Sequence, residues 1–183
     1  MSQHEIIFIV CSFLFGFIPF GYIFYFLTGK KDVKGKHTGT VSFMIDMVKG
    51  IIVIVYGLRH FDSPIIVLLG GSAVIIGHSF PFYLTFKEGK GVAVLLGVFI
   101  VFDFQSVVVF AIVFFLTLFF TNDGSAGSIA GVTALFFFTL FTHIVEVSTI
   151  VLVVVLLIIG KHRSNIQQLT AGTEDKFNWK IHG

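Results

Sequence analysis

Residues 63–103 read SPIIVLLGGSAVIIGHSFPFYLTFKEGKGVAVLLGVFIVFD. Two apolar runs, 63–82 and 91–103, enclose a polar loop that carries glycines and lysines. The first run reaches the length of about 20 residues that a helix needs to cross a bilayer. The stretch therefore predicts membrane-spanning helices that are joined by a polar loop at the membrane surface.

The composition of the whole chain agrees with this interpretation. Among its 183 residues, 56% are hydrophobic, only 12% are charged and 25 are phenylalanine. These values lie far outside the usage of soluble proteins. We therefore expect one integral membrane domain over residues 1–183, without a separate soluble domain.

Apolar run length and interrupting charges predict an all-α protein with about seven transmembrane helices. The fourth run is short, and Asp103 and Gln105 favour a break before the fifth. The first run is expected to be a retained helix, because its leader lacks the basic charge of a signal peptide. The expected spans are 5–27, 41–58, 63–82, 91–103, 105–120, 127–143 and 145–160.

The basic residues predict the orientation, because cytoplasmic loops carry the excess of lysine and arginine. With the N-terminus outside and the C-terminus in the cytoplasm, ten of the twelve basic residues fall on the inner side. Arg59 then lies in an outer turn and Lys49 inside the second span. The ten are Lys30, Lys31, Lys34, Lys36, Lys87, Lys90, Lys161, Arg163, Lys176 and Lys180.

Two polar segments of the expected cytoplasmic face are suited to a phosphate ester. In the 77–91 loop, backbone N–H groups at glycines can hold phosphate oxygens, and lysines add positive charge. A second cluster, 162–165 with 172–174 behind it, follows the last apolar run. We expect the two segments to lie side by side and to form one site.

Ionisable residues inside a span usually face a cavity or a partner. Asp46 and Lys49 share one helix face, so a structural pair is at least as plausible as a role in catalysis. Gly127 and Gly131 predict close helix packing, and Ser125 nearby is a candidate for contact with a substrate at the cytoplasmic end. The single cysteine excludes an internal disulfide, and no spacing of cysteine and histidine predicts a metal site.

Four motifs in this order on a seven-span chain resemble the bacterial acyl-phosphate:glycerol-3-phosphate acyltransferases. The resemblance covers nearly the whole chain and is closest in the 77–93 loop. The residues that carry it are Pro19-Phe20-Gly21-Tyr22; Asp46-Met47-Val48-Lys49-Gly50; Gly77-His78 with Phe80-Pro81, Phe86-Lys87 and Gly89-Lys90-Gly91-Val92-Ala93; and His162, Asn165, Leu169, Gly172 and Glu174.

The resemblance implies a multi-pass enzyme of the bacterial plasma membrane whose active site faces the cytoplasm. It would transfer an acyl group from a fatty acyl phosphate to glycerol 3-phosphate, giving lysophosphatidic acid for phospholipid synthesis, with no cofactor, metal or nucleic acid. It implies catalytic roles for His162 and Asn165 and supporting roles for Glu174 and Asp46. The implied substrate- and phosphate-binding residues are His78, Lys87, Gly89, Lys90, Gly91, Gly39, Ser42 and Lys49.

Three departures from the family pattern keep an alternative open. The first cytoplasmic loop lacks the family's usual motif, Glu88 replaces a glycine, and Gln168 replaces an arginine. A catalytically degenerate membrane paralogue that acts as a partner or regulator would explain them. A small transporter is a further alternative, although Asp46 and Lys49 are its main candidate mid-membrane charges and the halves of the chain do not resemble each other.

Overall fold

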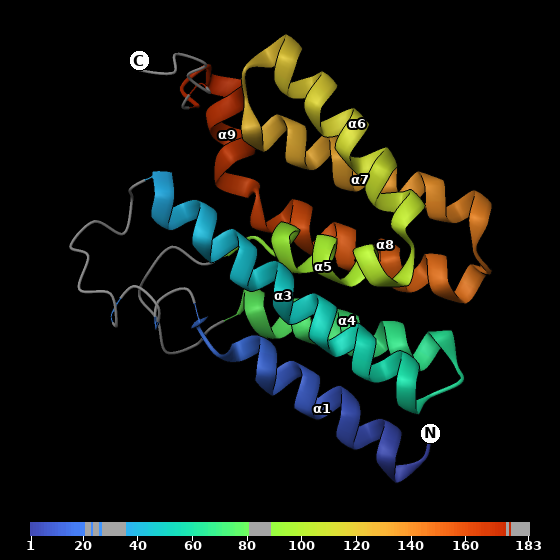
Figure 1. Ribbon diagram of the computed structural model, residues 1–183. Helices are drawn as coiled ribbons and strands as arrows, with labels where there is room; N and C mark the ends of the chain where they lie inside the picture. Colours follow the sequence, from blue (N-terminus) through green and yellow to red (C-terminus); the bar gives the residue numbers. More distant parts are fainter. Residues whose placement is uncertain (21–22, 24–25, 27–35, 81–88, 175, 177–183) are drawn as a thin grey trace. The chain divides into compact units, whose positions relative to one another are not determined.

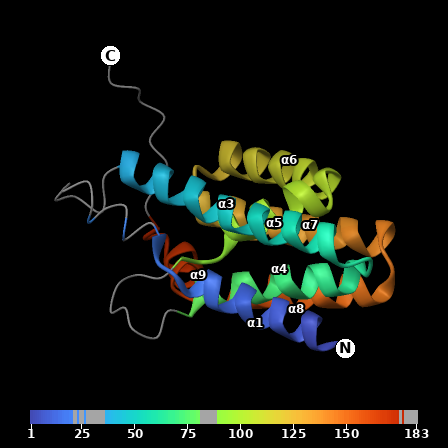
Figure 2. The same ribbon diagram turned by 60° about the horizontal axis from the view of Figure 1, so that its bottom comes forward.

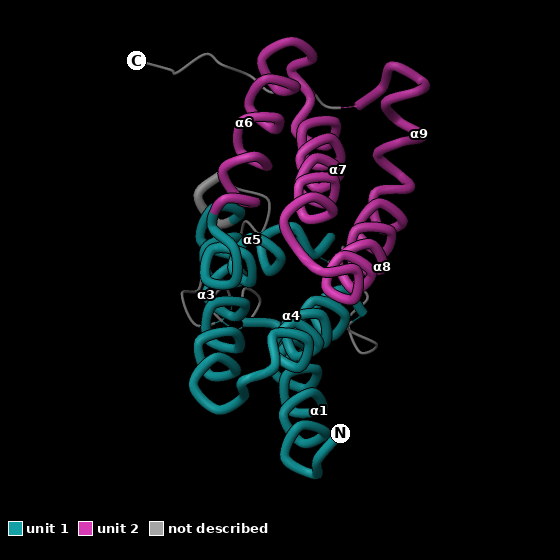
Figure 3. The backbone as a smooth tube through the Cα atoms, turned by 90° about the vertical axis from the view of Figure 1, so that its right-hand side faces the viewer, with its two compact units in different colours: residues 1–104 teal, residues 105–183 magenta. Residues whose placement is uncertain are grey.

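The computed structural model describes residues 1–20, 23, 26, 36–80, 89–174 and 176, and every regular element in these residues is a helix. The chain divides into two compact units, residues 1–104 and 105–183 (Figure 3). The helices, shown in Figure 1, are α1 (Gln3–Phe17), α3 (Lys36–His60), α4 (Pro64–Ser79), α5 (Val92–Phe102), α6 (Phe104–Thr121), α7 (Gly124–Thr142), α8 (Val145–Lys161) and α9 (Arg163–Ala171).

The helices α1 and α3 to α8 fall on the seven predicted apolar runs, which confirms the all-α prediction. By length and composition, α6, α7 and the Gly39–His60 part of α3 can cross a membrane. A fourth candidate is the pair α8 and α9, which is bent by 55° at its break. The helices α1, α4 and α5 are apolar but shorter, so the number of crossings stays a prediction.

The first helix is shorter than the expected span 5–27. It begins with a capping box in which the Ser2 hydroxyl accepts from the Glu5 backbone and the Glu5 carboxylate accepts from the Ser2 backbone. It ends at Phe17, where Ile18 takes an extended conformation. The cause is Pro19, which disfavours a helical conformation in the residue before it and lacks a backbone N–H.

Two further boundaries differ from the sequence-based expectation. The helix α3 begins at Lys36, whereas the expected span began at residue 41, so Gly39 also lies on the helix. The polar C-terminal motif also forms a helix, α9, which apolar run length cannot detect. The expected break near Asp103 is present, because Asp103 is extended between α5 and α6.

In unit 1, α4 packs against both α1 and α3, and α5 packs against α3 and α4 (Figures 1 and 2). Close approach depends on reciprocal glycines. A Cβ on Gly16 or Gly77 would overlap the backbone of the facing helix in the α1–α4 pair. Gly50 and Gly97 play the same part between α3 and α5. These crossings set the positions of Lys49 and His78, which directly adjoin Gly50 and Gly77 in the chain.

In unit 2, α7 packs against α8, and the short helix α9 contacts both. The predicted role of Gly127 and Gly131 in close packing is confirmed. The ring of Phe110 on α6 lies against Gly131, and the backbone and ring of Phe114 lie against Gly127. The start of α7 and the turn that joins it to α6 carry the polar side chains of this unit that are described below.

Candidate active site

A polar cluster in unit 1 joins α3 to the end of α4. The Lys49 ammonium lies 3.3 Å from an Asp46 carboxylate oxygen, as their spacing of three residues on one helix predicts. The His78 Nδ1 lies 3.5 Å from the same oxygen. Lys49 is 2% exposed, so its charge is balanced inside the protein rather than by solvent.

Lys49 also satisfies backbone groups where α1 ends. Its ammonium donates to the carbonyl of Ile18 at 2.7 Å and, more weakly, to that of Gly16 at 3.5 Å. Carbonyls at the last turn of a helix have no partner within the helix, and a buried one needs a donor from elsewhere. The ring of Phe20 lies 5.2 Å from the same ammonium. These contacts favour the structural interpretation of the Asp46–Lys49 pair.

The glycines of the predicted phosphate loop lie against this cluster. A Cβ added to Gly89 would overlap the His78 ring, so the backbone of residue 89 directly covers that side chain. Gly91 caps the N-terminus of α5 with φ of 86°, a conformation that favours glycine. The N-terminus of a helix presents backbone N–H groups and positive potential, as an anionic phosphate requires. Lys90 is half-buried beside them, whereas Lys87 and Glu88 lie outside the described residues.

A second cluster in unit 2 brings together the C-terminal motif and the start of α7. One carboxylate oxygen of Glu174 accepts from the Ser125 hydroxyl at 2.6 Å and from the Asn165 amide at 2.7 Å. Glu174 thus connects two segments that are 40 residues apart in the chain. The expected supporting role of Glu174 agrees with these contacts.

His162 lies at the bend between α8 and α9 and is 2% exposed. Its Nδ1 is 2.8 Å from the carbonyl of Ile158. Because a carbonyl only accepts, Nδ1 carries the hydrogen, and in the neutral ring Nε2 holds the lone pair.

The remaining predicted residues are less closely engaged. Gly39 is exposed on the first turns of α3, with open space around it. Ser42 is half-buried one turn further along. Neither position contradicts a role in substrate binding, which stays a prediction for both.

Sequence reasoning missed two contributions to these clusters. The carbonyls of Gly16 and Ile18 leave no trace in side-chain patterns, although a proline after an apolar run signals that such groups become free. Asp123 and Lys176 were not expected to interact, yet the two side chains meet at 3.1 Å. An Asn-Asp-Gly turn between two apolar helices was the available signal.

A groove of about 610 Å³ runs between α1 and α3 in unit 1. Apolar side chains line most of its length: Ile7, Phe8, Phe15, Ile52, Val53 and Phe61. Ser2, His4 and His60 lie at one end. Phe15 and Ile52 are each within one helical turn of the residues that form the Lys49 cluster, so the groove extends from that cluster toward the N-terminus of α1.

Comparison with known proteins places the chain among membrane acyltransferases. Residues 33–172 match the family model described as glycerol-3-phosphate acyltransferase. A glycerol-3-phosphate acyltransferase of Ehrlichia ruminantium (strain Gardel) is 33% identical, with 99% of this chain and 100% of that protein covered. One of Desulfotalea psychrophila (strain LSv54 / DSM 12343) is 34% identical, with 96% and 98% covered.

Solved structures show the same likeness. The crystal structure of PlsY (YgiH), an integral membrane glycerol 3-phosphate acyltransferase, in its glycerol 3-phosphate form has a TM-score of 0.86 at 27% identity. The match covers 96% of both chains. The lysophosphatidic acid form of PlsY has a TM-score of 0.85 at 28% identity, with the same coverage. The chain is thus a multi-pass membrane protein that belongs to the glycerol-3-phosphate acyltransferase family.

Proposed function

We propose that this protein transfers an acyl group from a fatty acyl phosphate to glycerol 3-phosphate and releases lysophosphatidic acid and inorganic phosphate. The observation that carries the proposal is the likeness over 96% of both chains to a structure described as the glycerol 3-phosphate form of such an enzyme. The polar clusters of the two units supply the groups that this reaction needs.

The reaction requires positioning and charge neutralisation more than activation. A hydroxyl oxygen of glycerol 3-phosphate attacks the acyl carbonyl carbon, the new ester C–O bond forms, and the C–O bond to phosphate breaks. The mixed anhydride is already activated and phosphate is a good leaving group, so no covalent enzyme intermediate is needed. The hydroxyl proton passes to His162 or to the departing phosphate.

Each cluster receives a role in this scheme. Gly89 and Gly91 donate backbone N–H groups to phosphate oxygens, and Lys90 and Lys87 balance the negative charge. Asn165 hydrogen-bonds the acceptor, and Glu174 holds the Asn165 amide in place. His78 adds a contact to phosphate. Asp46 and Lys49 keep His78 and the end of α1 in position.

The acyl chain of the donor occupies the groove between α1 and α3. Its lining is mainly apolar, and its inner end lies beside the Lys49 cluster. Ile52 is half-exposed along the groove, as expected of a side chain that meets a lipid tail. The donor thus enters from the bilayer, with its phosphate at the cytoplasmic surface of the bacterial plasma membrane.

The decisive measurement is phosphate release from a long-chain acyl phosphate by the purified protein, with and without glycerol 3-phosphate. We expect release that depends on the acceptor and yields lysophosphatidic acid. Gly89→Ala should lower it, whereas Gly160→Ala, on an exposed helix position with no atom within 4 Å of the new Cβ, should leave it unchanged.

The outcome that would reject the proposal is a folded, membrane-inserted protein that releases no phosphate with any donor or acceptor. A catalytically degenerate paralogue would then be the better explanation. The full-length likeness to named acyltransferases argues against this alternative.

A further inference from the structure

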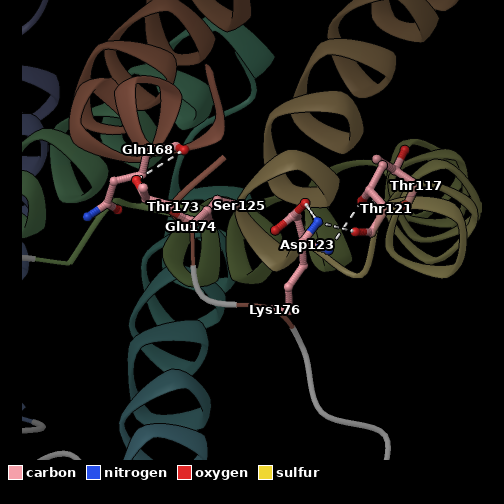
Figure 4. Close-up of polar contacts among 8 residues, drawn as sticks. All are labelled: Thr117, Thr121, Asp123, Ser125, Gln168, Thr173, Glu174 and Lys176. Atoms are coloured by element: carbon pink, nitrogen blue, oxygen red, sulfur yellow. Dashed lines mark hydrogen bonds and ion pairs between the residues drawn. The ribbon is translucent and has the colours of Figure 1, made fainter. Parts of the chain in front are cut away.

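The residues that follow α9 contact the rest of unit 2 at three points (Figure 4). At the first point, α9 ends at Gly172, whose φ is 68°, and the Thr173 backbone N–H and hydroxyl both donate to the Gln168 carbonyl. At the second, Glu174 holds Ser125 and Asn165.

At the third point, Lys176 meets the turn between α6 and α7. Its ammonium lies 3.1 Å from an Asp123 carboxylate oxygen and donates to the Thr121 carbonyl at 3.1 Å. The turn is ordered from within as well. The Thr121 hydroxyl donates to the Thr117 carbonyl at 2.8 Å and accepts from the Asp123 backbone N–H at 3.2 Å.

The second and third contacts are spaced equally along the two segments that they join. Glu174 meets Ser125, and two residues further along the chain, Lys176 meets Asp123, two residues back. The two segments therefore run antiparallel with their side chains paired at the same spacing. Because Lys176 is only two residues beyond Glu174, we expect its contact with Asp123 to restrain Glu174, whose carboxylate accepts from the Asn165 amide.

The Asp123 carboxylate is buried where it meets Lys176. Asp123 is 5% exposed, and its second carboxylate oxygen has no hydrogen-bond partner within the described residues. A buried carboxylate that loses its cation is strongly destabilised, whereas an exposed ion pair contributes little. Lys176 itself is 66% exposed, so solvent screens part of the pair, but its loss would leave the buried Asp123 carboxylate without this cation.

We propose that Asp123 and Lys176 form a latch that positions Glu174, and through it Asn165, for binding of the acceptor. Both are positioning residues rather than catalytic residues. The inference rests on the proposed function for the identity of the acceptor. The latch itself rests on the contacts alone.

The test compares Lys176→Met, Lys176→Arg and the double variant Asp123→Asn/Lys176→Met of the full chain, together with the unchanged protein. For Lys176→Met we expect the KM for glycerol 3-phosphate to rise about three- to tenfold, since a lost charge-assisted contact has this order of effect. The KM for acyl phosphate should change less than twofold. Lys176→Arg keeps the charge and should restore the acceptor KM to within about twofold of the unchanged protein.

The double variant distinguishes the loss of the Asp123–Lys176 contact from the cost of leaving a buried carboxylate without its cation. It removes the unpaired carboxylate, so thermal stability should recover. The acceptor KM should stay raised, because the latch is absent. It also keeps the test informative should Lys176→Met fail to fold.

Hydrogen exchange of residues 163–174 gives a readout that does not depend on activity. Faster exchange in Lys176→Met and normal exchange in Lys176→Arg support the latch, even if the protein lacks acyltransferase activity and the proposed function fails. Unchanged exchange and an unchanged acceptor KM in both Lys176→Met and the double variant would overturn the latch.

Discussion

Asp46 organises the polar cluster of unit 1, because one of its carboxylate oxygens is shared by Lys49 and His78. Helical spacing predicted the first of these partners. The second lies on another helix, α4, and its approach depends on the packing of α4 against α3. At the residue scale, local pairs were therefore predictable from the sequence. The partners that only helix packing brings together were not.

Replacement of Lys49 tests the structural role assigned to it. Lys49→Met leaves the Asp46 carboxylate without its cation and removes the donor to the Ile18 carbonyl. Breaking a buried pair on one side destabilises a protein by about 3 kcal/mol or more. We expect a clearly lower midpoint of thermal unfolding in detergent, partly recovered in Asp46→Asn/Lys49→Met. An unchanged midpoint, with glycerol 3-phosphate binding lost, would instead assign Lys49 to the substrate.

Gly89 provides a second test at this scale, because a new Cβ there meets the His78 ring. Gly89→Ala must displace either the ring or the backbone that we propose binds phosphate. We expect the KM for the phosphate-bearing substrates to rise about tenfold, which corresponds to about 1.4 kcal/mol of binding. Steady-state kinetics with each substrate varied in turn measure this effect, and Gly160→Ala is the matched control. A KM within twofold of the unchanged protein would show that this loop does not bind phosphate.

At the scale of elements, apolar run length located the helices well and their ends less well. It predicted α4, α5, α6, α7 and α8 to within a few residues. It placed the end of α1 too late, because a proline after an apolar run ends the helix without ending the hydrophobicity. It missed α9, whose exposed polar residues carry no apolar run. Hydrophobicity reports contact with lipid, whereas capping, proline and tertiary contacts decide where a helix stops.

If the acyl chain of the donor lies in the groove between α1 and α3, the size of the groove should limit the length of chain that the protein accepts. Ile52→Trp fills the groove beside the Lys49 cluster, so long acyl chains should fit less well than short ones. We expect the ratio of kcat/KM for the longest to the shortest donor in a chain-length series to fall about tenfold. Val48→Trp is the control, because Val48 is exposed on the same helix but does not line the groove. Equal profiles for the two variants would place the acyl chain elsewhere.

At the scale of the whole molecule, the family assignment rests on features spread along the full chain. The matched residues 33–172 include Asp46, Lys49 and His78 of unit 1 and Ser125 and Asn165 of unit 2, while Glu174 lies just beyond them. The departures at the start of α3 and at Gln168 lie within this matched range. That the two clusters act on one substrate stays a prediction, and the kinetic coupling of Gly89→Ala with Asn165→Ala measures it.

The orientation in the membrane is the prediction that concerns the entire chain. Ten of the twelve basic residues fall in segments that alternate helices would place on one side, and that side should be the cytoplasm. Seven crossings, an odd number, put the termini on opposite sides, so the N-terminus should lie outside.

A reporter that is active only outside the cell should stay silent when fused after Gly183. The same reporter should be active when fused after Asp62, in the turn between α3 and α4. A cytoplasm-specific reporter at the same two points should give the opposite pattern, which controls for expression. Strong outer activity after Gly183 would reverse the orientation and place Lys90 and His162 on the outer face, away from a cytoplasmic supply of acyl phosphate.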